Sequence, residues 1–161
     1  MGSTEFPVDD MGLHTFFNGD KPSHLVIPHY QRGYSWKQEH LDDFWGDLDS
    51  VRSDPSNEYF FGSIVGIKDK TTTGLLKYQL VDGQQRMATC AILLVVVRDL
   101  YMKIGSALVN ESEKEIFNKK ETPSSDYYYK IRLDDDDNDY FKNTILATIE
   151  PKVADKKEFV K

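Results

Sequence analysis

The sequence KYQLVDGQQR, residues 77–86, decides the fold of this chain, because it joins an expected β-strand directly to a long apolar helix. The strand is expected over Leu75–Val81 and the helix over about Gln84–Met102. Backbone N–H groups at a helix start lack intrahelical partners, and the helix dipole favours a negative charge placed over them. Gly83 lets an anion approach the backbone, and Arg86 can add a bidentate bond to phosphate oxygens. The junction therefore predicts a phosphate-binding site.

The same junction also fits a purely structural role. Asp82 can accept hydrogen bonds from the first helical N–H groups, and Gln85, three residues on, can complete a capping box. Both interpretations stay open on these residues alone, because short motifs match by chance at a high rate.

A second polar cluster, IPHYQRGYSW at residues 27–36, follows a short apolar segment that predicts a strand. A loop that only reverses the chain favours Gly, Asn, Asp or Ser. Gln31 and Arg32 are therefore candidate binding residues, and Tyr30 lies beside them. The alternative is that the aromatic side chains pack on the core while Arg32 stays in water: Tyr30, Tyr34 and Trp36.

Further elements are expected on either side of the junction. Tyr59–Lys68 and Leu75–Val81 predict an antiparallel pair of strands, which Gly62 and Ser63 interrupt. A glycine inside a strand marks either a close approach to the backbone or a kink. These two residues therefore form either a pocket wall or a bend in the sheet.

The remaining segments are expected mainly to support the fold. Ser35 and Gln38 predict a capping box that opens a helix, and its spacing of apolar residues predicts that Phe44 and Trp45 are buried. Glu111–Lys120 predicts a short exposed helix or a loop. Tyr127, Tyr129, Ile131 and Leu133 alternate as in a strand, and the carboxylates of Asp134–Asp137 fit either a helix start or a cation site.

Composition limits the classes of function. A chain of 161 residues with 39% hydrophobic and 29% charged residues predicts one folded domain, over 11–150, after a tag-like leader at 1–10 and before the start of a truncated downstream region at 151–161. The net charge of −7 opposes tight binding to duplex DNA by the chain alone. No apolar run approaches the roughly 20 residues that span a bilayer, and one cysteine excludes an internal disulfide, as expected for a reducing cytoplasm.

Three blocks of sequence carry a resemblance to a known family. IPHYQRGYSW, FFGSIV at Phe60–Val65 and LVDGQQRMATCAILL from Leu80 resemble, in order and spacing, the N-terminal domain of GmrSD-type modification-dependent restriction proteins. The likeness covers about Leu13–Leu100, and Ile131–Phe141 resembles a weaker block. Met87 and Ala88 stand where Leu and Thr are usual, and Thr89 keeps the hydroxyl. The family is similar in fold to ParB and sulfiredoxin, which implies an α+β domain with a small mixed sheet packed against helices.

The resemblance also implies a function. It implies binding and hydrolysis of a nucleoside triphosphate, with Mg²⁺, coupled to sensing of modified DNA by the full-length protein. An HNH-type nuclease would lie in a separate region or subunit, and a homo-oligomer is an open expectation. The expected catalytic residues are Asp82, Gln84, Gln85 and Arg86. The expected nucleotide-binding residues are Tyr30, Gln31, Arg32, Gly62, Ser63, Asp82, Gly83, Gln84, Gln85, Arg86 and Thr89.

Two alternatives accompany this interpretation. The chain carries no unambiguous base or nucleophile, so a non-catalytic module that binds a nucleotide or a DNA phosphate is the rival function. Cys90, one turn after Arg86, is either a thiol of sulfiredoxin type or a small hydrophobic core residue, and the apolar run that follows it favours the core.

Overall fold

The fold is seen in a computed structural model, which describes residues 12, 17, 23–54, 56, 58–71, 76–118, 125, 128–133 and 135–147. The expected leader at 1–10 and the expected downstream segment at 151–161 lie outside these residues. Within the described residues, no helix is long and apolar enough to cross a membrane.

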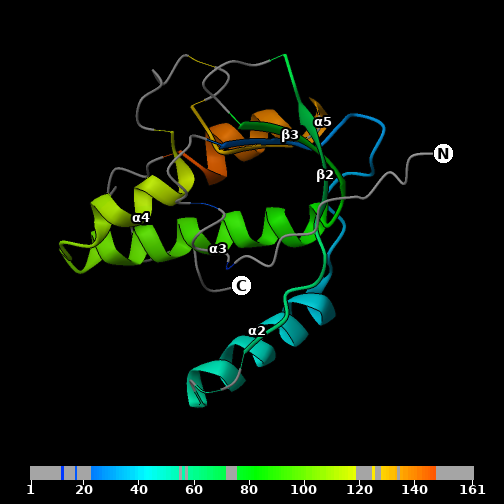
Figure 1. Ribbon diagram of the computed structural model, residues 1–161. Helices are drawn as coiled ribbons and strands as arrows, with labels where there is room; N and C mark the ends of the chain where they lie inside the picture. The colour runs from blue at the N-terminus through cyan, green and yellow to red at the C-terminus, as the bar shows by residue number, and fades with distance from the viewer. Residues whose placement is uncertain are drawn as a thin grey trace.

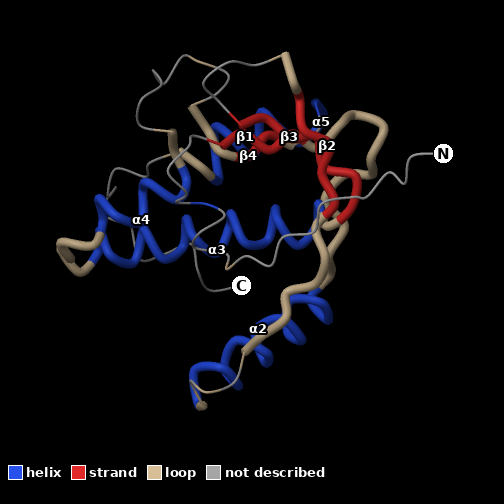
Figure 2. Tube along the Cα trace, viewed as in Figure 1, coloured by secondary structure: helices blue, strands red, loops and turns tan. Residues whose placement is uncertain are grey.

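A four-stranded mixed sheet forms one layer of the molecule (Figure 2). Its strands, in the order β2-β3-β1-β4, are β2 (Val65–Asp69), β3 (Leu76–Asp82), β1 (Ser23–Val26) and β4 (Ile131–Arg132). β1 is parallel to both β3 and β4, whereas β2 is antiparallel to β3. The parallel β1–β3 pair brings the ends of both strands to one edge of the sheet. The loop after β1 and the junction after β3 therefore meet, although about fifty residues of sequence separate them.

The helices form the second layer and an extension from it. Figure 1 shows α3 running beneath the sheet with α4 at its side, while α2 extends away from both. α5 leads directly into a π-helical turn, η1. The helices are α2 (Gln38–Ser53), α3 (Gln84–Lys103), α4 (Val109–Ile116), α5 (Asp135–Tyr140) and η1 (Phe141–Ile145). The domain is thus α+β, as the sequence predicts.

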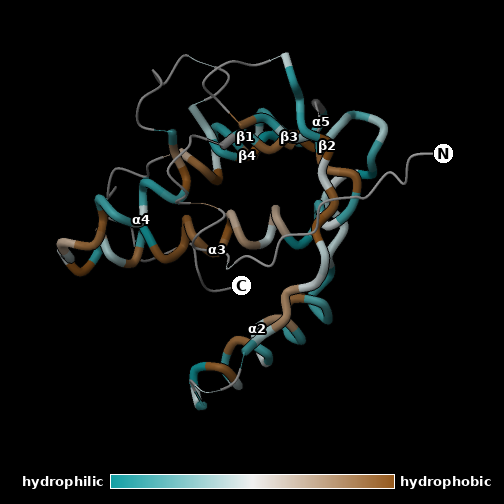
Figure 3. Tube along the Cα trace, viewed as in Figure 1, coloured by the Kyte–Doolittle hydropathy of each residue, from teal (hydrophilic) through white to brown (hydrophobic). Residues whose placement is uncertain are grey.

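The core lies between the sheet and α3, where Leu25 and Leu80 of the strands join Met87 and Cys90 of the helix in one buried cluster. In Figure 3, hydrophobic positions run along most of α3. Arg98 is also fully buried, and its guanidinium donates to the carbonyl oxygens of Leu146 and Ala147 at 3.0 Å each. These bonds fix the end of η1 against the C-terminal part of α3.

Two expectations about strand and helix burial are wrong. β2 begins at Val65, so Gly62 and Ser63 lie in the irregular segment before the strand rather than inside it. Trp45 is 64% exposed, whereas Phe44 is buried. The reason is that α2 leans away from the body, and only its Phe44 side meets the rest of the chain, through edge-on contact with Phe61 at 5.8 Å between ring centroids.

The predicted caps are also different in the structure. α2 starts at Gln38 after Lys37, whose N–H donates to His40 Nδ1 at 3.1 Å, and Ser35 takes no part. α3 has Gly83 at its N-cap with no side-chain hydrogen bond, so the Asp82–Gln85 capping box does not form. At α3, the Gln85 amide that the local rule assigns to a cap binds the Gly33 carbonyl and the Ser35 N–H instead.

The last elements match their predictions in part. α4 forms a helix where one was expected, and its Ile116 is buried in the core cluster. The predicted strand around Tyr129 contracts to Ile131–Arg132, with one isolated bridge between Phe117 and Tyr129. A helix starts at Asp135, as one interpretation of the acidic run predicts. The described residues contain no group of three acidic, histidine or cysteine side chains that could hold a metal ion.

Candidate functional site

The start of α3 is an uncapped helix terminus. Gly83 has φ +87°, and a Cβ added there would stand 2.3 Å from Ile64 Cδ1, so only glycine fits. The first helical hydrogen bond runs from Met87 N–H to Gly83 O at 3.0 Å. The N–H groups of Gln84, Gln85 and Arg86 have no acceptor among the described residues. These donors and the helix dipole leave a positive end that suits an anion.

Two glutamines fix the loop after β1 onto this helix start. Gln85 donates from Nε2 to Gly33 O at 3.0 Å and accepts from the Ser35 N–H at 2.7 Å. Gln84 donates from Nε2 to Gln31 Oε1 at 3.0 Å, and Gln31 donates to Val81 O at 3.3 Å. Both ends of the Gln85 amide are therefore occupied, which makes Gln85 a residue that positions the loop.

A tyrosine and an aspartate complete the attachment of this loop. The Thr89 hydroxyl donates to Gln85 O at 2.9 Å, so its bond with the Tyr34 hydroxyl, also 2.9 Å, has tyrosine as the donor. The Tyr34 N–H donates to Asp137 Oδ2 of α5 at 3.0 Å. The loop is thus held from two helices, α3 and α5.

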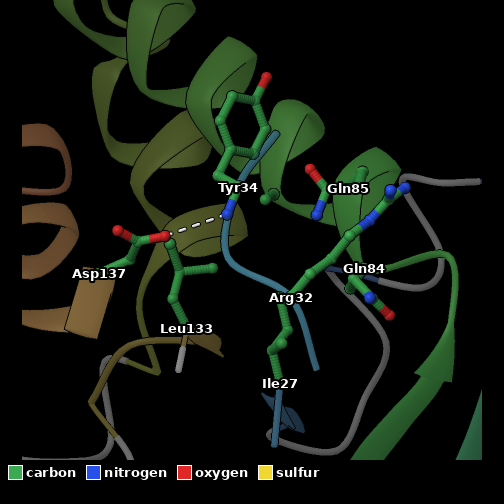
Figure 4. A pocket seen from close by; sticks show the side chains of 8 residues that line it. Ile27, Arg32, Tyr34, Gln84, Gln85, Leu133 and Asp137 are labelled. Atoms are coloured by element: carbon green, nitrogen blue, oxygen red, sulfur yellow. Dashed lines mark hydrogen bonds between the residues drawn. The ribbon is translucent and has the colours of Figure 1, made fainter. Parts of the chain in front are cut away.

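A small cavity lies under the loop, between α3 and α5 (Figure 4). Its volume is ≈ 10 Å³, about the space that one water molecule needs. The cavity is therefore too small to hold a phosphate group inside it. The side chains that line the cavity are Ile27, Arg32, Tyr34, Gln84, Gln85, Ala88, Leu133 and Asp137.

Arg32 is the positively charged side chain that lines this cavity. It is exposed, and its guanidinium makes no hydrogen bond or ion pair with any described residue. In Figure 4 its side chain extends on the same side of the cavity as Gln84 and Gln85, whereas Asp137 lies on the other side. Arg32 is thus available to an anion that rests over the first turn of α3.

Arg86 does not line the cavity, because its guanidinium is bound to a second loop. Nη2 donates to Ser63 O at 2.8 Å, and Nη1 to Phe61 O at 3.4 Å. Nη2 also lies 3.3 Å from Asp82 Oδ2. The Arg86 side chain is 28% exposed in this arrangement, so it joins the segment before β2 to the helix start while keeping contact with solvent.

The structure divides the predicted site residues into two groups around the start of α3. One group surrounds the cavity and the loop on it: Gln31, Arg32, Gln84, Gln85 and Thr89. The other surrounds the Arg86 guanidinium: Gly62, Ser63, Asp82 and Arg86. Gly83 lies between the two groups. Tyr30 belongs to neither, since its ring is 65% exposed and packs edge-on against His29.

Sequence reasoning missed two residues of the site, Tyr34 and Asp137. Tyr34 was assigned to core packing as an alternative, and Asp137 was assigned to a helix start or a cation site. The hydrogen bond that joins them spans 103 residues, so no local pattern could have paired them. The available signal was that each of these residues follows a strand, Tyr34 after β1 and Asp137 after β4, because adjacent parallel strands bring the segments that follow them together.

Cys90 has a structural role. It is buried in the core cluster, and burial raises the pKa of its thiol to about 12. A thiol with so high a pKa carries almost no thiolate at neutral pH and is a poor nucleophile. The core interpretation of Cys90 is therefore the one that the structure supports.

The comparison with known protein families gives one match. Residues 13–160 match the family described as GmrSD restriction endonuclease, N-terminal domain. A comparison with curated proteins finds no match. The family match covers every element described above, including both loops that meet at the start of α3.

Proposed function

We propose, since this chain belongs to the family of GmrSD restriction endonuclease N-terminal domains, that the start of α3 binds the phosphates of a nucleoside triphosphate. Family membership assigns the chain to DNA restriction, and the nucleotide is our inference. One observation carries it: no described residue accepts from the three consecutive N–H groups at Gln84–Arg86 or pairs with the guanidinium of Arg32, which lines the same cavity as Gln84 and Gln85. Such donors and a free guanidinium bind phosphate oxygens through charge-assisted hydrogen bonds.

The residues around the helix start take different roles in this proposal. Arg32 and the helix N–H groups contact the phosphates directly. Gln84 and Gln85 hold the Arg32 loop in place through their amides. Arg86 holds the segment that contains Gly62 and Ser63 against the start of α3, and its side chain is 28% exposed to solvent.

Hydrolysis is the finer part of the proposal. Phosphoryl transfer to water depends mainly on positioning and charge neutralisation, so it needs no strong nucleophile from the protein. Asp82 is 64% exposed directly before the helix start, where a carboxylate fits Mg²⁺ shared with phosphate oxygens. When bound, Mg²⁺ would neutralise the charge that develops on the phosphates. Gln84 Oε1 accepts no hydrogen bond from a described residue, so it can orient a water molecule.

A non-catalytic binding module is the second candidate function. The observation that favours it is that polar side chains of the cavity already have protein partners. The Gln85 amide is bonded at both ends, and Asp137 accepts the Tyr34 N–H. Few side chains are then left to activate water. In this version the site binds a nucleotide or a DNA phosphate and changes how the domain contacts the rest of the restriction protein.

Cleavage of modified DNA requires parts beyond this chain in either version. A net charge of −7 opposes tight binding to duplex DNA, which depends on neutralising phosphates with Lys and Arg. We therefore place DNA contact in the full-length protein, and we place cleavage in an HNH-type region or subunit. The purified chain should leave both modified and unmodified DNA intact when Mg²⁺ and nucleotide are supplied.

Calorimetric titration with ATP and GTP in Mg²⁺ tests the proposed site. Arg32→Ala should weaken binding by about tenfold or more, because a hydrogen bond to a charged group contributes about 1.5–3 kcal/mol. Arg52→Ala is the matched control, because Arg52 is an exposed arginine on α2 that pairs only with Asp49 among the described residues. Equal affinity in wild type and Arg32→Ala would remove Arg32 from the site, and no binding by wild type would end the proposal. Phosphate release, measured in parallel, separates hydrolysis from binding alone.

A further inference from the structure

We infer that Asp137 is a positioning residue of the nucleotide site, which holds Arg32 in its binding position through the backbone of the intervening loop. The inference rests on the proposed function and adds a residue to it. Asp137 belongs to α5, which lies more than fifty residues beyond the strand–helix junction in the sequence, yet its carboxylate lines the same cavity as Arg32. Its Oδ2 accepts the Tyr34 N–H at 3.0 Å, two residues after Arg32.

The backbone next to Arg32 is fixed at three consecutive points. Gly33 O accepts from Gln85, the Tyr34 N–H donates to Asp137, and the Ser35 N–H donates to Gln85. A single side chain of α3 therefore supplies the two outer bonds, and α5 supplies the central one. The central bond has an ionised acceptor, and such bonds are about twice as strong as neutral ones.

Arg32 depends on this attachment because its own side chain has none. Its guanidinium makes no bond with a described residue, so the fold positions Arg32 through its backbone. A loop that is already ordered loses less conformational entropy when it binds. Asp137 therefore acts on affinity by preorganising the loop, without contact with the phosphates.

The role belongs to this single carboxylate and does not extend to the acidic run around it. Asp136 and Asp139 are exposed, and neither lines the cavity. Asp137 is half-buried, and the bond that it forms joins segments 103 residues apart. A general effect of negative charge would come from all members of the run, whereas positioning predicts an effect of Asp137 alone.

Three variants test the inference: Asp137→Ala, Asp137→Asn and Asp139→Ala. The first removes the acceptor. The second keeps an amide oxygen that can accept the Tyr34 N–H but removes the charge. The third removes a carboxylate from the same helix without touching the loop. Amide hydrogen exchange of the loop peptide containing Tyr34 is measured without ligand, and affinity for ATP with Mg²⁺ is measured by calorimetry.

Asp137→Ala should speed exchange of the Tyr34 amide and weaken ATP binding by about tenfold, the effect of one hydrogen bond of ordinary strength. Asp137→Asn should recover most of both properties, and Asp139→Ala should resemble wild type. Unchanged exchange in Asp137→Ala would overturn the positioning role. Faster exchange with unchanged ATP affinity would also overturn the inference while leaving the proposed site intact.

Two further outcomes separate the inference from the proposed function. If Asp137→Asn binds ATP as weakly as Asp137→Ala while its loop stays protected, the charge of Asp137 acts directly on the ligand, and positioning is wrong. If wild type binds no nucleotide, the proposed function fails and the inference fails with it. The exchange data then assign Asp137 to loop stability alone.

Discussion

The guanidinium of Arg86 lies against the Cα of Gly62, so closely that a Cβ added to Gly62 would stand 1.8 Å from Arg86 Nη1. Gly62 also has φ +95°, which other residues rarely adopt. The backbone conformation and this contact together explain why a glycine precedes β2.

Gly62→Ala should therefore destabilise the domain. The left-handed backbone alone costs a non-glycine residue roughly 1–2 kcal/mol, and the displaced Arg86 adds to that cost. Gly46→Ala is the matched control, because Gly46 is inside α2 and a Cβ there meets nothing within 4 Å. That change should stabilise the domain by about 0.5–1 kcal/mol, as expected in a helix interior. Urea denaturation measures both, and a Gly62→Ala protein as stable as wild type would contradict the packing of Arg86.

Gln85→Glu should detach the loop that carries Arg32. The change keeps the acceptor for the Ser35 N–H but turns the donor to Gly33 O into an oxygen that repels it. Gln85 is 8% exposed, so an introduced carboxylate would be desolvated and its pKa raised. We expect a loss of about 1–3 kcal/mol at neutral pH, measured by urea denaturation.

The pH dependence of this variant gives a second check. A carboxyl group with a raised pKa in the folded state binds its proton more tightly there than in the unfolded chain. The stability lost in Gln85→Glu should therefore return as pH falls through the folded-state pKa. Gln79→Glu, at an exposed position of β3, is the control and should show neither effect. A loss in Gln85→Glu that does not change with pH would argue against a buried carboxylate.

Lys130 should make stability depend on pH in the alkaline range. Burial lowers the pKa of its amine to about 8 from 10.5, although the amine donates to Phe17 O. The unfolded chain then binds more protons than the folded one between these two values, so the lysine destabilises the fold fully below pH 8 and progressively less as pH rises. The measurement is the stability difference between wild type and Lys130→Met from pH 7 to pH 10.5. Wild type should gain relative to the variant across that range, and a constant difference would mean that the amine titrates normally.

Cys90 should be unreactive in the folded protein. Burial raises the pKa of its thiol to about 12, and the side chain is in the core cluster beneath the sheet. An aromatic disulfide reagent at pH 8 should label the protein only after urea is added. Rapid labelling of the native chain would revive the interpretation of Cys90 as a reactive thiol.

The sequence determined the central elements of the fold because their signals are local. The run of strand, glycine and helix at residues 77–86 fixes where β3 ends and α3 begins, and both appear where expected. The α+β class follows from the same evidence, because apolar residues repeat with the period of a strand before the glycine and with the period of a helix after it. The loop after β1 was also identified, because its polar and aromatic residues are unusual for a simple turn.

The tertiary structure decided what each polar side chain binds. One interpretation of Gln85 was a cap of its own helix, but its amide binds Gly33 and Ser35, because the parallel pairing of β1 and β3 brings that loop within reach. Arg86 was expected at a phosphate site with Arg32, yet its guanidinium binds the carbonyls before β2. A local rule shows which donors and acceptors a residue has, but distant packing determines which partner is close enough.

Which hydrophobic side chains are buried also depended in part on the sequence and in part on the tertiary structure. Leu25 and Leu80 are buried because they lie on the strands that pack against α3. Phe44 and Trp45 are neighbours on one helix with equal apolar character, yet only Phe44 is buried, since the direction in which α2 leaves the body selects one side of it. Periodicity tells which side of a helix can be buried. The position of that helix against the rest of the chain decides which side is.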